Sequence, residues 1–428
     1  MDGGAYKRYV LSALTVVYTL NYLDSNLMTL FLQPIKEDLR LSDTQLGFVT
    51  GIAFGLFYAT MGVPIARWAD RGNRSTITSI AIGLWGLTVM SCVFVTNFVQ
   101  LVCARIAAGI GESGCLPPTY SLVGDYFPKP AERTRAMAVY MLANPLSALT
   151  SFVLGGWLND AYGWRKTFFL MGFPALAVAV LVRLTVRDPR FGKDSTPLRA
   201  PARVAMADVL RALWRRSSSR HLVFALILVL TIGAGLGPWF AAFMMRSHAM
   251  QTSELGIWFG IIFGGSGICG ILLGSQLLTR WVGDDESAQL RWTAAIIAGI
   301  VPCFLLFLLV PGKHAALVSL TVLMIVFNLF IGPTFALLQR LFEDGMRATA
   351  LAVVMLLVNL FGAGLGPQLV GALSDELEPL LGGESLRYAM LSMSFVAFWA
   401  SAHFWRAART VRTDLAQVEH VVRKWKTT

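Results

Sequence analysis

Three ionisable residues interrupt long apolar stretches of the sequence: Asp24, Arg105 and Glu112. A charge at the centre of a lipid bilayer costs at least about 2.5–3.5 kcal/mol, so such residues usually face one another or a water-filled cavity. Burial in an apolar cavity also disfavours the charged form of a carboxyl group. A carboxyl group that loads and releases a proton as its access to water alternates is the physical basis of proton coupling. Asp24, Glu112 and Arg105 are therefore candidates for that chemistry.

The depth of these residues along their helices favours a pairing. Asp24 follows Tyr9 by 15 residues, about 22 Å of helix, which leaves it roughly 8 Å from the far edge of a bilayer core. Arg105 follows Phe98 on a helix that runs the other way, and it lies roughly 10 Å from the same edge. Asp24 and Arg105 could thus form an ion pair, either functional or a static brace between helices. Glu112 lies two turns beyond Arg105 on the same face, about 10 Å deeper.

The composition indicates which elements must position these residues. Of the 428 residues, 55% are hydrophobic and only 14% are charged. A soluble domain is about one quarter charged, so a string of soluble domains is excluded. A membrane-spanning helix needs about 20 apolar residues. The sequence predicts an all-α membrane protein with twelve transmembrane helices, near residues 9–33, 46–67, 75–96, 98–122, 135–158, 164–186, 221–245, 254–279, 292–310, 315–339, 347–373 and 386–408.

The net charge of +11 would suit a nucleic-acid binder, but the positions of the charges explain it differently. With a cytoplasmic N-terminus, 28 of the 36 Lys and Arg residues lie on the inner side, seven lie outside, and Arg105 lies within the membrane. This bias follows the positive-inside rule and predicts two cytoplasmic termini. The basic residues then face a lipid bilayer with an anionic inner leaflet, and no nucleic-acid partner is needed. Short loops favour the bacterial inner membrane for this multi-pass protein.

The two groups of six helices repeat one another. Arg67-Trp68 returns as Arg280-Trp281, and Pro118 returns as Pro333, at offsets of 213 and 215 residues. Two pseudo-symmetric six-helix halves with a site between them near the midplane form a transporter architecture. The predicted parts are an N-terminal half at 1–186, a basic cytoplasmic linker at 187–220, a C-terminal half at 221–408 and a basic cytoplasmic tail at 409–428.

The linker contains a helical pattern of its own. Apolar residues recur at helical spacing from Val204 to Trp214, beside Arg211 and Arg215. This pattern predicts a basic amphipathic helix on the inner leaflet, and the alternative is a solvated linker without that role.

The fourth predicted helix carries Gly109, Gly111 and Gly114, followed by Pro117-Pro118. Small residues allow helices to approach closely, and proline removes backbone hydrogen bonds. The stretch therefore predicts either a local hinge or a packing groove.

The loop after the second helix, residues 66–74, resembles the Gly-x-x-x-Asp-Arg-x-Gly-Arg motif of the major facilitator superfamily. Asp70, Arg71 and Arg74 match that motif. Its two glycines are replaced by Ala66 and Asn73. The resemblance implies that Asp70, Arg71 and Arg74 form a gating loop, which braces the inner helix ends in one access state.

More specific resemblances are spread over essentially the whole chain. They are Asn21-Tyr22-Leu23-Asp24, the stretch Leu41–Gly47, Gly109-Ile110-Gly111-Glu112-Ser113, and the stretches Asn359–Pro367 and Gly371–Asp375. Together they resemble the spinster-like branch of the superfamily, which includes transporters of sphingosine phosphate and lysophospholipids. In addition, Arg105-x-x-x-Gly109-x-Gly111 resembles the helix-four motif of the superfamily, whose arginine is linked to proton movement. The branch usually has an arginine where this sequence has Ser25. Arg105 is then the only cavity cation we can name, which leaves a phosphate-bearing substrate in doubt.

The resemblance implies that helices one, four, seven and ten line the cavity. The candidate substrate-binding residues are Arg105, Glu112, Tyr22, Asn26, Tyr58, Tyr120, Trp239, Phe243, Asn328, Thr334, Phe335 and Asn359. An aromatic wall with a few amides and hydroxyls suits an amphipathic or aromatic organic molecule better than a sugar. Alternatively, these aromatic residues only pack against lipid or neighbouring helices.

The leading hypothesis is a proton-coupled secondary active transporter of a lipid-like or amphipathic solute, acting as a monomer by alternating access. The alternative is a uniporter or uptake symporter for small aromatic or carboxylate compounds. A non-transporting membrane receptor is a remote alternative, and an enzyme is not expected because no nucleophile or metal cluster is visible. The five histidines and five cysteines are scattered, so we expect no metal and no cofactor other than the proton.

Overall fold

We examined a computed structural model of the chain. The residues it describes are 3–191, 206–283, 285–342 and 346–427. Every regular element in these ranges is a helix, in agreement with the all-α prediction. The chain divides into unit 1, which comprises Met1–Arg199 and Pro238–Gly264, and unit 2, which comprises Ala200–Gly237 and Gly265–Thr428.

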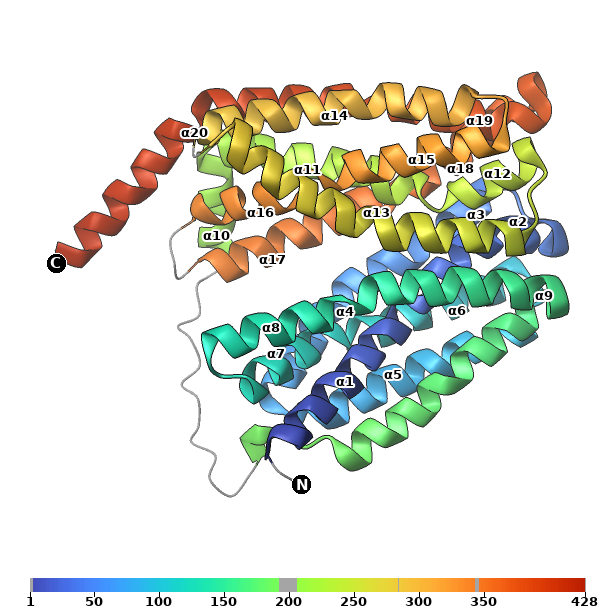
Figure 1. Ribbon diagram of the computed structural model, residues 1–428, viewed down its shortest axis with the longest axis horizontal. Coiled ribbons are helices and arrows are strands. Elements are labelled where there is room, and N and C mark those ends of the chain that lie inside the picture. The colour runs from blue at the N-terminus through green and yellow to red at the C-terminus, as the bar shows by residue number, and fades with distance from the viewer. Residues whose placement is uncertain (1–2, 192–205, 284, 343–345, 428) are drawn as a thin grey trace. The chain divides into compact units, whose positions relative to one another are not determined.

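Unit 1 is a helical bundle. Its elements are α1 (Gly3–Asn21), α2 (Leu23–Leu39), α3 (Asp43–Thr50), α4 (Ile52–Arg71), α5 (Arg74–Ser91), η1 (Cys92–Phe94), α6 (Phe98–Ser113), α7 (Leu116–Tyr126), α8 (Pro130–Met141), α9 (Ala143–Thr185), η2 (Pro189–Phe191), α12 (Trp239–His248) and the first part of α13 (Thr252–Trp281). Helix α5 lies alongside α9, and α6 packs against both α4 and α5 (Figure 1).

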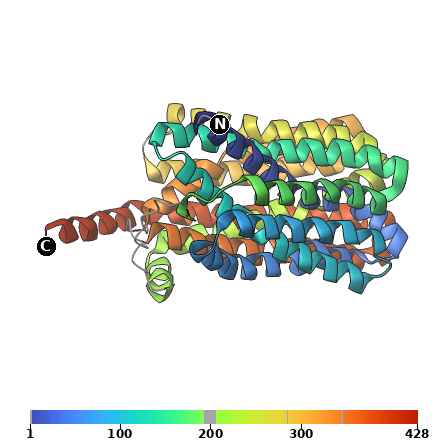
Figure 2. The ribbon, with the colours of Figure 1, turned by 90° about the horizontal axis from the view of Figure 1, so that it is seen from below.

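Unit 2 contains the remaining helices. They are α10 (Met206–Arg215), α11 (Ser217–Leu236), the rest of α13, α14 (Glu286–Leu309), α15 (Lys313–Asn328), α16 (Ile331–Arg340), α17 (Arg347–Leu357), the π-helical turn η3 (Val358–Ala363), α18 (Leu365–Leu381), η4 (Gly382–Glu384), α19 (Ser385–Ser394) and α20 (Val396–Thr427). Helix α20 packs against α11 and α14, and its last turns extend beyond the other helices of the unit (Figures 1 and 2).

The membrane crossings agree with the twelve-helix prediction. Eight described segments are long and apolar enough to cross a membrane. Two of these, Pro130–Phe191 with 62 residues and Thr349–Val418 with 70, are each long enough for two crossings, so the eight segments account for ten. The pairs α1–α2 and α15–α16 supply the other two. The predicted twelve-helix fold is confirmed.

Several crossings are broken near their middle. Glycines lie at three breaks: Gly51 between α3 and α4, Gly114 between α6 and α7, and Gly237 between α11 and α12. The break between α1 and α2, at Tyr22, directly precedes Asp24. Helix breaks free backbone groups, and a membrane tolerates them where protein buries them or where they line a cavity. Two of the breaks in unit 1 therefore lie next to the carboxyl groups that the sequence singled out.

The segment Pro238–Gly264 belongs to unit 1, although it lies in the C-terminal half of the sequence. Arg246 on α12 donates two hydrogen bonds of 2.7 Å to the carboxylate of Asp43, which receives a third, of 2.6 Å, from Lys36. Asp43 is 1% exposed, so its charge requires such partners. Ser42 forms a capping box at the start of α3, and this fixes the first turn on which Asp43 lies.

The backbones of α9 and α13 approach closely at two glycines. A Cβ atom on Gly256 would lie 2.2 Å from the carbonyl oxygen of Phe152, and one on Gly156 would lie 2.4 Å from that of Thr252. The carboxylate of Asp160 accepts a short hydrogen bond from the Thr252 hydroxyl. These contacts attach the start of α13 to unit 1.

In unit 2, α20 fastens the starts of two other helices. Asp414 is buried and accepts hydrogen bonds from the backbone N–H and the hydroxyl of Ser218, at 2.8 and 2.5 Å. Asp285 caps α14 and accepts a hydrogen bond from Arg412. This bond holds the pKa of the Asp285 carboxyl below its ordinary value. The basic tail is thus partly built into unit 2.

The predicted amphipathic helix of the linker corresponds to α10. Val204 lies outside the described residues, as does the rest of 192–205. Leu213 is buried against the unit, whereas Leu210 and Trp214 are 46% and 59% exposed. The helix therefore has an exposed apolar stripe that is available to the bilayer, and its contact with the inner leaflet remains a prediction.

Candidate functional site

The centre of the candidate site is a buried ion pair in unit 1. Arg105 on α6 donates a short hydrogen bond to the carboxylate of Asp24 in the first turn of α2. The two side chains are 5% and 2% exposed. The guanidinium also lies 4.7 Å from the centroid of the Phe54 ring, which adds a cation–π contact. The structure thus contains the ion pair that helix depth allows, and its part in proton coupling stays a prediction.

Glu112 lies in the last turn of α6 and is 3% exposed. Among the described residues, no group forms a hydrogen bond with its Oε2 atom. Asp24 and Arg105 are close enough to act on it electrostatically. A buried carboxylate without a partner is costly unless a proton, a cation or a substrate group compensates its charge. Glu112 is therefore the side chain in this site that is most in need of a proton or a ligand.

The buried amide of Asn21 reinforces this picture. Asn21 is fully buried at the end of α1, and neither of its amide atoms has a hydrogen-bond partner within the described part of the chain. The Nε atom of Arg105 is likewise buried without one. Buried polar groups are normally paired, so exceptions require an explanation such as a ligand or water. In the sequence, Asn21 stood out only as part of a stretch that resembles the spinster-like branch, and it was not among the predicted site residues.

The glycines of α6, in the fourth predicted membrane crossing, determine how closely α6 approaches its neighbours α4 and α5. A Cβ atom on Gly109 would lie 2.8 Å from the carbonyl oxygen of Phe54, and one on Gly111 would lie 2.9 Å from the backbone nitrogen of Trp85. These glycines let α6 touch α4 and α5. The close approach agrees with the predicted packing groove. Gly114 lies at the break between α6 and α7, and a hinge there stays a prediction.

We expect Gly111→Ala to destabilise the protein by about 1–3 kcal/mol, because the added methyl group meets backbone atoms that cannot rotate away. Gly62→Ala on α4 is the matched control, since nothing lies within 4 Å of its added Cβ. The control should be neutral or slightly stabilising. Thermal unfolding in detergent measures both variants, and equal melting temperatures would contradict the proposed close approach.

Four tyrosines of unit 1 form a cluster that includes Tyr22. The Tyr18 ring lies 5.2 Å from that of Tyr22 and 4.8 Å from that of Tyr140, and Tyr120 lies 5.2 Å from Tyr140. Glu112 acts electrostatically on Tyr22. The predicted Tyr22 and Tyr120 thus join a larger cluster. Tyr18 precedes Tyr22 by one helical turn and could have been found from that spacing, whereas nothing in the sequence pointed to Tyr140.

Two other predicted residues on the N-terminal side lie in the same unit. Tyr58 is half-buried, and Glu112 acts on it electrostatically. The Asn26 amide donates a long hydrogen bond, of 3.4 Å, to the hydroxyl of Ser147. Tyr58 and Asn26 therefore both lie within unit 1, as the Asp24–Arg105 pair does.

The remaining predicted substrate residues lie elsewhere. Trp239 and Phe243 on α12 are fully buried within unit 1. In unit 2, the amides of Asn328 and Asn359 and the hydroxyl of Thr334 each donate to a carbonyl one turn earlier on the chain. Phe335, on α16, is half-buried. Contact of these residues with substrate stays a prediction.

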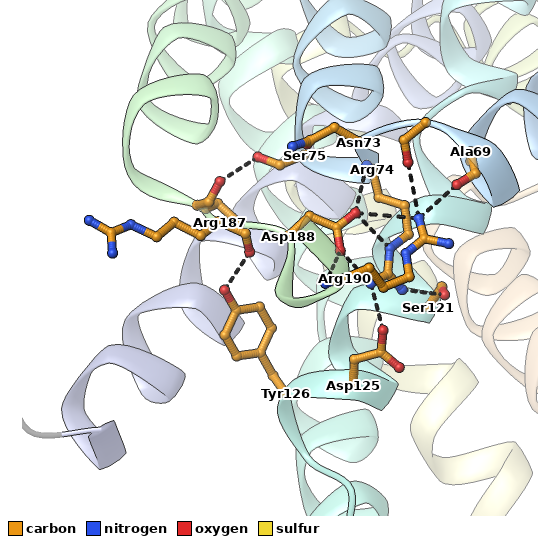
Figure 3. A network of polar contacts seen from close by, with 12 residues as sticks. Ala69, Asn73, Arg74, Ser75, Ser121, Asp125, Tyr126, Arg187, Asp188 and Arg190 are labelled. Atoms are coloured by element: carbon orange, nitrogen blue, oxygen red, sulfur yellow. Dashed lines mark hydrogen bonds and ion pairs between the residues drawn. The ribbon is translucent and has the colours of Figure 1, made fainter. Parts of the chain in front are cut away.

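Arg74 of the predicted gating loop is buried, and it lies in a network of polar contacts (Figure 3). Arg74 donates to both carboxylate oxygens of Asp188, at 2.6 and 3.0 Å, and to Asp125 at 2.5 Å. The Asp188 side chain is fully buried. Asp70 and Arg71, in contrast, are exposed. Arg74 therefore ties the start of α5 to α7 and to the segment after α9 within unit 1, and the gating role of the loop remains a prediction.

The departure from the family motif at Asn73 has a structural reason. The Asn73 side chain accepts a hydrogen bond of 3.0 Å from the Thr76 N–H and so caps α5. Arg190 in η2 donates to the carbonyl oxygens of Ala69 and Gly72, at 2.8 and 3.1 Å, where α4 ends (Figure 3). The end of α4 and the start of α5 are thus both capped. Asp188 and Arg190 were not predicted as site residues, because both lie in the predicted linker.

Comparisons with known proteins identify the family of the chain. The family model of the Major Facilitator Superfamily matches residues 14–367. An MFS-type efflux pump of Mycolicibacterium smegmatis is 31% identical, and the similarity spans 94% of this chain and 93% of the pump's chain. A sphingosine-1-phosphate transporter of Danio rerio is 25% identical, covering 88% of this chain and 79% of its own.

A solved structure gives the same result for the fold. It is the crystal structure of a bacterial homologue of the human lysosomal transporter spinster, in an inward-facing and unoccupied conformation. The TM-score is 0.85 at 28% identity, over 96% of this chain and 98% of the other. The chain therefore belongs to the Major Facilitator Superfamily and is a spinster-like membrane transporter.

Proposed function

We propose that the protein is a proton-coupled secondary transporter of an amphipathic or lipid-like organic solute. The observation that carries this proposal is Glu112, a buried carboxyl group with an unpartnered oxygen in the described structure, beside the Asp24–Arg105 pair. A proton binds Glu112 when the site opens to one side of the membrane and leaves when the site opens to the other side. This exchange couples the proton gradient to the solute gradient. The proton is the only coupling ion in this scheme.

The chemistry of the site supports an amphipathic solute. The rings of Tyr18, Tyr22 and Tyr140 form one aromatic cluster, and Glu112 acts electrostatically on its member Tyr22. Such a cluster suits an apolar body, and Glu112 suits a polar head. The Danio rerio relative supports the same solute class, because it is a sphingosine-1-phosphate transporter. The name of the mycobacterial relative, an efflux pump, favours export.

The positive-inside bias supports a cytoplasmic location for both termini and insertion in a bacterial inner membrane. In this orientation the Arg74 network and the capped ends of α4 and α5 face the cytoplasm. We propose that the protein acts as a monomer.

Flux in proteoliposomes tests the proposal. The purified protein is first screened by thermal shift with lysophosphatidylcholine, cholate and benzoate, since a ligand at 100 times its Kd stabilises the folded state by about 2.7 kcal/mol. The compound with the largest shift is then used as the transported probe. We expect its flux to rise when a pH gradient is imposed. Flux that is equal with and without the gradient would instead identify a uniporter, which is the alternative function.

A further inference from the structure

A groove on unit 1 lies apart from the candidate site. It has a volume of about 370 Å³ and runs between the start of α5 and the end of α9. Its apolar wall is formed by Ile80, Ala179, Val180 and Leu184. Ile80, Val180 and Leu184 are 50%, 58% and 77% exposed, as expected for side chains that face lipid.

The groove carries a charged side chain at one end only, whereas the Ser79 hydroxyl, which also lines it, donates to the carbonyl oxygen of Ser75. Helix α5 begins at Arg74 and α9 ends at Thr185, so Thr76 and Arg183 lie near the same end of the two antiparallel helices. Ile80 and Val180 lie about one helical turn deeper. The groove thus has a hydroxyl and a guanidinium at its mouth and an apolar floor behind them.

The cation at the mouth is not neutralised by the protein. Within the described ranges, the Arg183 guanidinium has no ion-pair or hydrogen-bond partner, and the Thr76 hydroxyl has none either. The nearby carboxylates of Asp188 and Asp125 are instead engaged by Arg74. An exposed, uncompensated arginine beside an apolar groove complements an anionic group that carries an alkyl chain.

We propose that this groove between α5 and α9 binds an anionic glycerophospholipid of the bilayer. Arg183 and Thr76 hold the phosphate, and one acyl chain lies along Ile80, Val180 and Leu184. The positive-inside prediction puts this end of α9 on the cytoplasmic side, where anionic headgroups attract basic residues by about 1 kcal/mol each, or roughly fivefold in occupancy. The site does not depend on which solute is transported.

Photolabelling of the full-length protein in nanodiscs tests this site. The nanodiscs contain phosphatidylcholine and a trace of phosphatidylglycerol that bears a diazirine on one acyl chain, and mass spectrometry locates the cross-links. We expect labels on α5 and α9 at the groove. Arg183→Gln should lower this labelling about fivefold, Arg183→Lys should retain most of it, and Val180→Trp should lower it by filling the groove.

Two variants serve as controls. Arg135→Gln removes another exposed arginine, on α8, and should leave the labelling unchanged. Glu112→Gln should also leave it unchanged, which separates this site from the proposed transport site. Equal labelling by a phosphatidylcholine probe with the same diazirine chain would overturn the proposal, as would full labelling of Arg183→Gln or cross-links that avoid both helices.

Discussion

Glu112→Gln is expected to remove the response of transport to a pH gradient. Glutamine has nearly the shape of glutamic acid but cannot bind or release a proton, so the two access states no longer differ in proton affinity. An effector without differential affinity shifts no equilibrium. The ratio of solute flux with a gradient to flux without one should therefore fall to about one. The measurement is flux of the screened probe in proteoliposomes at matched protein density.

The matched control for this experiment is Glu132→Gln. Glu132 lies in the first turn of α8, with its side chain 49% exposed, in a surface pair with Lys129. The control should keep the response of the unmodified protein, since exposed pairs contribute little. If Glu112→Gln and Glu132→Gln respond equally to the gradient, Glu112 is not the coupling group.

Arg74→Met is expected to produce the largest loss of stability. It leaves the buried Asp188 carboxylate with Arg190, at 3.3 Å, as its remaining ion-pair partner. Removing one member of a buried ion pair typically costs 3–5 kcal/mol, because the other charge stays buried without compensation. We expect a fall in Tm of at least about 5 °C in detergent. Thermal unfolding followed by tryptophan fluorescence provides the measurement.

Two further variants separate this network from a general charge effect. Arg71→Met removes the exposed neighbouring arginine and should change stability by no more than about 0.5 kcal/mol. Adding Asp188→Asn to Arg74→Met should recover part of the loss, because the buried charge that Arg190 compensates only in part is then gone. A Tm for Arg74→Met equal to that of Arg71→Met would show that the buried network does not stabilise unit 1.

Much of the fold could be predicted from the sequence because its main signals are local. Apolar runs as long as the bilayer is thick determine the crossings, and the repeat of Arg67-Trp68 at Arg280-Trp281 indicates the duplication. Residue counts along two helices also placed Asp24 and Arg105 at similar depth, which made their ion pair possible, since helical rise is constant.

Residues with distant partners could not be predicted in this way. Asp43 and Arg246 are 203 positions apart, and Arg74 and Asp188 are 114 apart. Hydropathy and rise give the depth of a residue but not the rotation of its helix or the identity of its neighbours. The sequence therefore offered Asp43 only as part of a family stretch and did not select Asp188.

For Glu112, too, the sequence determines the depth of the residue, and helix packing determines its partners. Sequence alone determined that a carboxyl group lies deep in an apolar helix, because composition and rise establish depth. Only the tertiary structure decided that its Oε2 atom lacks a partner among the described residues while Asp24 has one in Arg105. The reason is that the cost of a buried charge depends on which groups the neighbouring helices bring within hydrogen-bond distance, and helix packing determines those groups.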